Sequence, residues 1–127
     1  MKLERLLYLE DEPDIQSVAK LALELLGGYE VLLCGSGTEA LNQVCGFSPG
    51  LILLDVMMPD MDGPTTLQRL RGDPNTAKIP VIFLTAKTEA SEVKRYQALG
   101  ALDVIAKPFD PMTLAVQVQK IWSQAHG

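Results

Sequence analysis

Five short apolar runs alternate with five segments of helical character along the chain. The runs cover residues 5–9, 29–34, 51–54, 80–85 and 103–106. Three of them are continuously apolar, which is typical of strands that are covered on both faces. A strand, a helix and a further strand in succession favour a parallel pair with a right-handed crossover. This alternation is the feature that most restricts the fold.

The segments between the runs have the periodicity of helices. We expect helices over residues 14–27, 37–46, 64–71, 88–99 and 111 to about 124. In the first of them the apolar residues recur close to the helical period of about 3.6 residues. These residues are Ile15, Val18, Leu21, Ala22 and Leu25.

Residues at the expected helix starts support these boundaries. Ser36 followed by Glu39 has the spacing of a capping box. Pro64 suits the first turn of the third helix, and Asp110 followed by Pro111 predicts a cap and a first-turn proline for the last.

The repeated strand–helix unit predicts an α/β fold of the flavodoxin-like (βα)5 type. Its five parallel strands would lie in the order 2-1-3-4-5, with helices on both faces. Neither a linker nor a low-complexity tract interrupts the pattern, so residues 1–127 are predicted to form a single domain. Ligand sites in such sheets lie at the carboxyl ends of the strands, where the strand order reverses.

Composition narrows the class of protein. The net charge of -5, without a basic stripe, argues against direct nucleic-acid binding. The apolar runs are far shorter than the roughly 20 residues that cross a bilayer, and Met1 leads into a charged segment that does not resemble a signal peptide. The two cysteines, Cys34 and Cys45, lack the spacing of a metal or redox motif. We therefore expect a cytoplasmic protein.

Polar side chains follow the strands at one predicted edge of the sheet. Glu10, Asp11 and Glu12 follow the first strand, with Glu12 interpreted as a solvated residue, and Asp55 follows the third. Like charges at one crevice raise one another's pKa unless a cation neutralises them. The available cations are the lysine after the fifth strand, Lys107, and Mg²⁺, which prefers carboxylate oxygens.

These side chains, with Thr85 after the fourth strand, suit phosphoryl transfer. That reaction depends mainly on positioning and on neutralisation of charge. A carboxylate can itself accept the phosphoryl group and become an aspartyl phosphate. Asp55 is the candidate acceptor because it is central and is carried by a buried strand.

The motifs at these strand ends resemble those of the receiver domains of two-component response regulators. They are the acidic pair after the first strand, "LLDVMMPDMDG" around Asp55, "FLTA" at Thr85 and "KPF" at Lys107. Each motif is weak alone, but the four occur in order and at the ends of the expected strands. The resemblance covers the whole chain.

The resemblance implies that Asp55 accepts phosphate from a histidine kinase or a histidine phosphotransfer protein. Thr85 would donate its hydroxyl to one phosphoryl oxygen, and Lys107 would pair with another. The domain would be a regulatory switch and not an enzyme in the ordinary sense, since it catalyses only its own Mg²⁺-dependent phosphorylation and dephosphorylation. Phosphorylation would change contacts with a downstream protein target or favour a homodimer.

The resemblance also implies a Mg²⁺ site. Asp11 and Asp55 would bind the ion directly, Glu10 would act through water, and the backbone carbonyl of Met57 would be a further ligand. The Lys107–Pro108 peptide bond would be cis.

Further implications of the resemblance concern two surrounding segments. Pro59 and Gly63 would shape the loop after Asp55, with Gly63 supplying backbone freedom. The surface from Ile15 to Ala22 would select the kinase. Tyr8 and Trp122 are interpreted as core or partly buried residues.

Two positions depart from the family's pattern. Glu10 stands where a second aspartate is usual and reaches one methylene further. Val104 stands where many receivers have a tyrosine or phenylalanine that turns inward on activation. Switching would then depend on Thr85 and its loop.

Three other functions stay open on the sequence. A receiver that no longer switches and serves as a docking module would fit Val104 and Glu10. A phosphatase of the haloacid dehalogenase type would need a second aspartate where Met57 stands. A flavin protein of the same fold would need phosphate donors where the sequence has "EDEP". The sequence leaves open whether this chain acts alone or is part of a longer protein.

Overall fold

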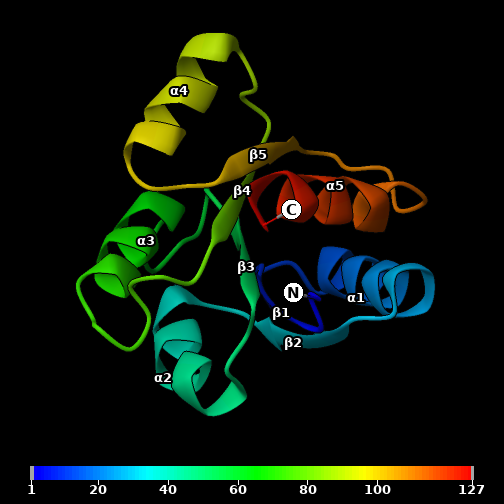
Figure 1. Ribbon diagram of the computed structural model, residues 1–127, viewed down its shortest axis with the longest axis horizontal. Helices are drawn as coiled ribbons and strands as arrows, with labels where there is room; N and C mark the ends of the chain where they lie inside the picture. Colours follow the sequence, from blue (N-terminus) through cyan, green and yellow to red (C-terminus); the bar gives the residue numbers. More distant parts are fainter. Residues whose placement is uncertain (1, 127) are drawn as a thin grey trace.

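The computed structural model describes residues 2–126, so Met1 and Gly127, the two ends of the predicted domain, lie outside the described residues. Five parallel strands form one sheet in the order β2-β1-β3-β4-β5 (Figure 1). The strands are β1 (Arg5–Leu9), β2 (Glu30–Cys34), β3 (Leu51–Asp55), β4 (Val81–Thr85) and β5 (Asp103–Ala106). The helices are α1 (Pro13–Gly27), α2 (Gly37–Phe47), α3 (Gly63–Arg71), α4 (Ala90–Ala98) and α5 (Leu114–His126). The predicted fold class and strand order are confirmed.

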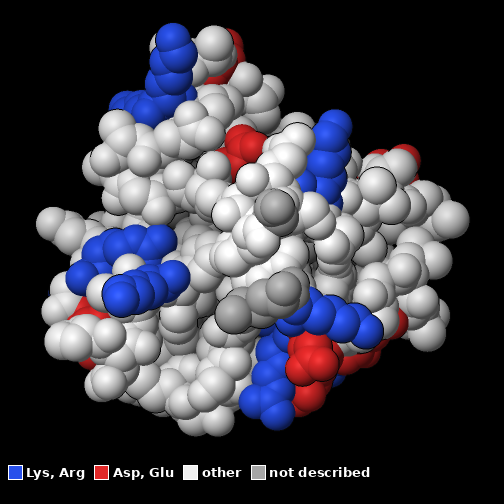
Figure 2. All heavy atoms as spheres, viewed as in Figure 1, with Lys and Arg blue, Asp and Glu red and all other residues white. Residues whose placement is uncertain are grey.

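The surface charges agree with the absence of a basic stripe from the sequence. On the face shown in Figure 2, lysines and arginines form separate groups over α4, around α3 and beside the N-terminus, with acidic side chains among them. Among residues 2–126, none of the helices combines the length and the apolar character that a membrane span requires.

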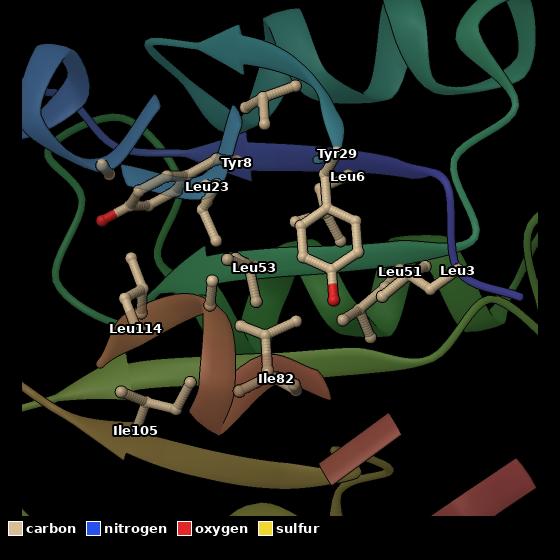
Figure 3. Close-up of a cluster of buried hydrophobic side chains, with 14 of the residues drawn as sticks. Leu3, Leu6, Tyr8, Leu23, Tyr29, Leu51, Leu53, Ile82, Ile105 and Leu114 are labelled. Carbon is tan, nitrogen blue, oxygen red and sulfur yellow. The ribbon is translucent and has the colours of Figure 1, made fainter. Parts of the chain in front are cut away.

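Helices cover both faces of the sheet, and each face has its own apolar core. One core lies under α1 and α5 and includes Leu6, Tyr8, Leu53 and Ile82 (Figure 3). The other lies under α2, α3 and α4 and includes the alternate residues of the same strands. All five residues of β3 and of β4 are buried. This two-sided burial explains why those strands are continuously apolar in sequence.

The start of α5 differs from the prediction. Residues 111–113 form a turn, and the helix begins at Leu114. Asp110 still organises this start, because its backbone carbonyl accepts the N–H groups of Thr113 and Leu114, each at 3.0 Å. The first of these bonds spans three residues and the second spans four, so a tight turn leads into the helix.

The capping-box prediction for α2 is correct for Ser36 and wrong for Glu39. The Ser36 hydroxyl accepts the Glu39 N–H at 3.1 Å. The Glu39 carboxylate does not close the box. It accepts the N–H of Gly35 at 2.9 Å, one residue before the cap.

The buried face of α1 matches the one that the periodicity suggested only at Ala22. Ala19, Ala22 and Leu23 are buried, whereas Val18 and Leu25 are 44% and 74% exposed. The helix is apolar around more than half of its circumference, so the same spacing fits two faces. The face with the two alanines turns inward because small side chains allow a close approach to the strands.

Gly63 is required for space and not for an unusual backbone conformation. Its φ lies outside the left-handed region, which Gly28 and Gly100 adopt. A Cβ atom at Gly63 would lie 2.9 Å from the backbone oxygen of Asp55 and 2.9 Å from the Cα of Val56. Neither backbone atom can move without displacing the end of β3.

We expect Gly63→Ala to destabilise the protein by about 2 kcal/mol, because the added methyl group overpacks the backbone of β3. Urea unfolding followed by circular dichroism measures this change. Gly46→Ala is the matched control, since a Cβ atom there meets nothing within 4 Å. Replacing a helical glycine at such an open position should raise stability by up to about 1 kcal/mol. Equal effects of the two substitutions would contradict the steric explanation.

Candidate functional site

The site lies at the carboxyl ends of β1 and β3, where the strand order reverses. Asp55 is the last residue of β3 and is 3% exposed. Glu10 directly follows β1 and is fully buried, and its N–H donates to the Cys34 carbonyl at 3.0 Å. The backbone pairing of the strands therefore holds both carboxylates in place.

Lys107 joins the two buried carboxylates. Its Nζ lies 2.7 Å from Asp55 Oδ2 and 3.0 Å from Glu10 Oε1. It reaches the site from the segment after β5, and the Lys107–Pro108 peptide bond is cis, as predicted. Removing Lys107 alone would be costly, because both buried carboxylates would keep their charge without their partner.

Three carboxylates converge beside this ion pair. Glu10, Asp11 and Asp55 each offer an oxygen, and these oxygens all lie within 4.8 Å of one another. Asp11 is exposed, whereas the other two are buried. Hard oxygen donors at this spacing suit a divalent cation such as Mg²⁺. The predicted acidic residues are therefore brought together.

Thr85 and Met57 also lie at this edge of the sheet. Thr85 ends β4 and is 5% exposed, and its hydroxyl oxygen accepts the N–H of Lys87 at 3.0 Å. The N–H of Met57 donates to Asp55 Oδ1 at 3.0 Å, while the side chain of Met57 is 80% exposed. The role of the Met57 carbonyl stays a prediction.

A cavity of about 590 Å³ is lined by Asp55, Thr85 and Lys107. Apolar side chains also line it, with Ile15 and Val18 from α1 among them. The exposed face of α1 thus borders the site.

The electrostatics of the ion pair differ between its members. Burial raises the pKa of Glu10, and the charge of Asp55 adds to this rise, although the hydrogen bond from Lys107 opposes it. Burial lowers the pKa of Lys107, but hydrogen bonds to Asp55 and Glu10 outweigh it and the net shift is upward. Lys107 therefore stays protonated at neutral pH.

Tyr8 takes a part in this site that its place in an apolar run did not indicate. Its hydroxyl donates to Glu10 Oε1 at 3.5 Å. Burial, followed by the charges of Glu10 and Asp55, raises the pKa of Tyr8 far above its usual range, so the hydroxyl stays a neutral donor. Tyr8 and Glu10 are two residues apart on an extended segment, and this spacing places both on the same face. That spacing was the available signal.

We expect Glu10→Gln to stabilise the protein at neutral pH. The raised pKa means that the folded state binds a proton on Glu10 more readily than the unfolded chain does. The stability contributed by Glu10 is therefore fully present below its ordinary pKa of about 4.5 and is lost as pH rises through the folded-state pKa. Unfolding free energies of the wild type and the variant should converge below about pH 4.5 and diverge above it. Glu12→Gln, which changes an exposed glutamate nearby, is the matched control. A Glu10→Gln protein that is no more stable than the wild type at pH 7 would contradict the raised pKa of Glu10.

Comparison with known proteins shows the family of the chain. The family model described as "Response regulator receiver domain" matches residues 6–119. The DNA-binding dual master transcriptional regulator RpaA of Synechocystis is 36% identical over 117 residues, which are 92% of this chain and 48% of that protein. The DNA-binding response regulator MtrA of Mycolicibacterium smegmatis is 35% identical over 91% of this chain and 49% of its own length. The chain spans about half the length of these curated relatives.

Solved structures show the same likeness over nearly complete chains. The signal receiver domain of a signal transduction histidine kinase from Syntrophus aciditrophicus is 36% identical with a TM-score of 0.80, covering 95% of this chain and 91% of that one. The chemotaxis response regulator CheY4 of Vibrio cholerae is 28% identical with a TM-score of 0.86, covering 94% and 99% of the two chains. The resemblance drawn from the four motifs is confirmed, and the chain belongs to the receiver domains of two-component response regulators.

Proposed function

We propose that this receiver domain is a phosphoryl-accepting switch, with Asp55 as the acceptor and a histidine kinase or a histidine phosphotransfer protein as the donor. The observation that carries the proposal is the environment of Asp55. One oxygen accepts a hydrogen bond from Lys107 Nζ at 2.7 Å and the other accepts the Met57 N–H at 3.0 Å. The carboxylate is held in one orientation and lines the cavity, as nucleophilic attack requires.

In the proposed reaction, an oxygen of Asp55 forms a bond to phosphorus while the bond from phosphorus to the donor's imidazole nitrogen breaks. The electron pair of that bond stays with the imidazole. Lys107 would then pair with a phosphoryl oxygen, since its ammonium already lies against Asp55. Thr85 would donate to another, because its oxygen accepts from Lys87 and its hydroxyl donates to no group within residues 2–126.

We further propose that Glu10, Asp11, Asp55 and the Met57 carbonyl form the Mg²⁺ site, with Glu10 acting through water. The convergence of three carboxylates supports this assignment. Bound Mg²⁺ would neutralise the negative charge that a phosphoryl group brings to these residues. Lys107 would supply the remaining positive charge.

The phosphoryl donor is proposed to dock over the cavity beside α1. Ile15 and Val18 line this cavity together with Phe109 from the segment after β5. Val18 and Leu21 are 44% and 59% exposed, although both are apolar. A partner helix that covers this face would bury them and bring its histidine to Asp55, which supports the kinase-selecting role expected for residues 15–22.

The output is proposed to pass through protein contacts. A downstream protein target or a phosphorylation-dependent homodimer would recognise the changed surface, and the domain itself would not contact DNA. The net charge of -5 and the separate basic groups of Figure 2 support this. The two relatives that are named as DNA-binding are about twice as long as the segment that matches this chain. A single domain over residues 1–127 and a cytoplasmic location belong to the same proposal.

Incubation with acetyl phosphate and Mg²⁺ should add the mass of one phosphoryl group to the intact protein. Asp55→Ala should abolish the addition, because the nucleophilic oxygen is lost. Asp60→Asn is the matched control. Asp60 is an exposed aspartate in the loop after β3, whereas Asp55 is the aspartate that pairs with Lys107. Intact mass spectrometry measures the change. Phosphorylation of the Asp55→Ala protein to the wild-type extent would refute the acceptor assignment.

The response to phosphorylation should be narrow, because Val104 provides no ring that could turn inward. Val104 is half-buried and packs in the core that contains Phe83 and Tyr96. We expect amide shifts caused by beryllofluoride and Mg²⁺ to concentrate at Thr85 and the loop after it, with small changes over residues 94–120. Val104→Tyr should spread them into that region.

Nuclear magnetic resonance of both proteins tests this expectation. Wild-type shifts that already extend across residues 94–120 would contradict it. Shifts confined to the acceptor site, together with a partner affinity that ignores phosphorylation, would instead favour a docking module that does not switch.

A further inference from the structure

Tyr8 connects the apolar core to the acceptor site. Its side chain is fully buried among Leu23, Leu53 and Leu114, under α1 and α5. In Figure 3 its hydroxyl points away from Leu23 and Leu53, toward the carboxyl ends of the strands. There it meets Glu10 Oε1 at 3.5 Å, and the structure shows no other partner for it within residues 2–126.

Glu10 is turned inward by the contacts of both its oxygens. Oε1 accepts from the Tyr8 hydroxyl and from Lys107 Nζ at 3.0 Å, and Oε2 accepts the Glu12 N–H at 3.2 Å. The carboxylate is fully buried. A glutamate can bend back in this way because it has two methylene groups, whereas the single methylene of aspartate would leave its carboxylate short of Tyr8.

We propose that Tyr8 is a positioning residue of the acceptor site, whose hydroxyl keeps the carboxylate of Glu10 on Lys107 and restrains it from turning toward the cation. Tyr8 and Glu10 are then a matched pair, since the tyrosine hydroxyl requires the longer acid as its acceptor. Glu10 then pairs mainly with Lys107, and Asp11 and Asp55 are the carboxylates that would bind Mg²⁺ directly. The part that concerns the cation rests on the proposed function, whereas the pairing of Tyr8 with Glu10 does not.

A double-mutant cycle with Tyr8→Phe and Glu10→Asp tests the pairing without any change of charge. The first readout is the Mg²⁺ dissociation constant of the unphosphorylated protein, from an amide NMR titration. Tyr8→Phe should lower this dissociation constant by about threefold or more, because Oε1 of Glu10 loses one of its two donors and the carboxylate can turn outward. In the Glu10→Asp background the same substitution should leave the constant unchanged.

The second readout is the urea midpoint of unfolding without Mg²⁺. Glu10→Asp should lower it when Tyr8 is present, because a buried hydroxyl loses its acceptor. Glu10→Asp should lower the urea midpoint less in the Tyr8→Phe background, where no tyrosine hydroxyl remains to lose its acceptor. Tyr29→Phe is the control, since its hydroxyl bonds Gln119 Oε1 at 2.8 Å at the opposite edge of the sheet. That substitution should not change the Mg²⁺ constant.

The inference is overturned if Tyr8→Phe changes the Mg²⁺ constant equally in both backgrounds, changes it in neither, or weakens binding when Glu10 is present. It is overturned equally if Glu10→Asp lowers the midpoint by the same amount with and without the Tyr8→Phe substitution. Both readouts are made without a phosphoryl donor. A cycle that behaves as expected in a protein that acetyl phosphate fails to modify would therefore contradict the proposed function alone.

Discussion

A single ammonium group between two buried carboxylates is the interaction on which the rest of this site depends. Lys107 Nζ lies within 3.0 Å of both Glu10 and Asp55, which leave the sheet from neighbouring strands. Two buried carboxylates so close together would repel each other strongly without a cation. The ammonium makes their burial tolerable and ties the segment after β5 to the ends of β1 and β3. The same group supplies positive charge where a phosphoryl group would arrive.

The two apolar cores give this charged cluster a rigid support. β3 is buried on both faces, so the position of Asp55 is set by packing on both sides of the sheet. The polar groups lie at one edge because all five strands run in the same direction. Tyr8 belongs to one of these cores and also contacts Glu10. The core thereby influences the direction of a site carboxylate as well as the position of its backbone.

The fold and the clustering of the candidate site residues were predictable because parallel topology converts linear order into position. Asp55 and Thr85 end their strands and Lys107 follows one, so knowing the strands was enough to bring them together. Features that depend on competition between similar choices were not predictable. α1 has apolar residues on two faces, and its periodicity did not show that Ala19 and Leu23 would be buried. The inward turn of Glu10 depends on a hydroxyl from Tyr8, which the sequence presented only as an apolar-run residue. Gly63 is needed for a close backbone approach that no local pattern reveals.

The contact at Gly63 also has an entropic consequence for the loop between β3 and α3. The N–H of Gly63 donates to the Val56 carbonyl at 3.0 Å, so residues 56–63 close into a small ring. Asp62 caps α3 by accepting the Thr65 N–H at 2.8 Å, which fixes the far end of that ring. The conformational freedom of this segment is thus given up when the chain folds. A ligand that arrives beside Asp55 meets backbone that is already ordered, and little of its binding free energy is lost to ordering the loop.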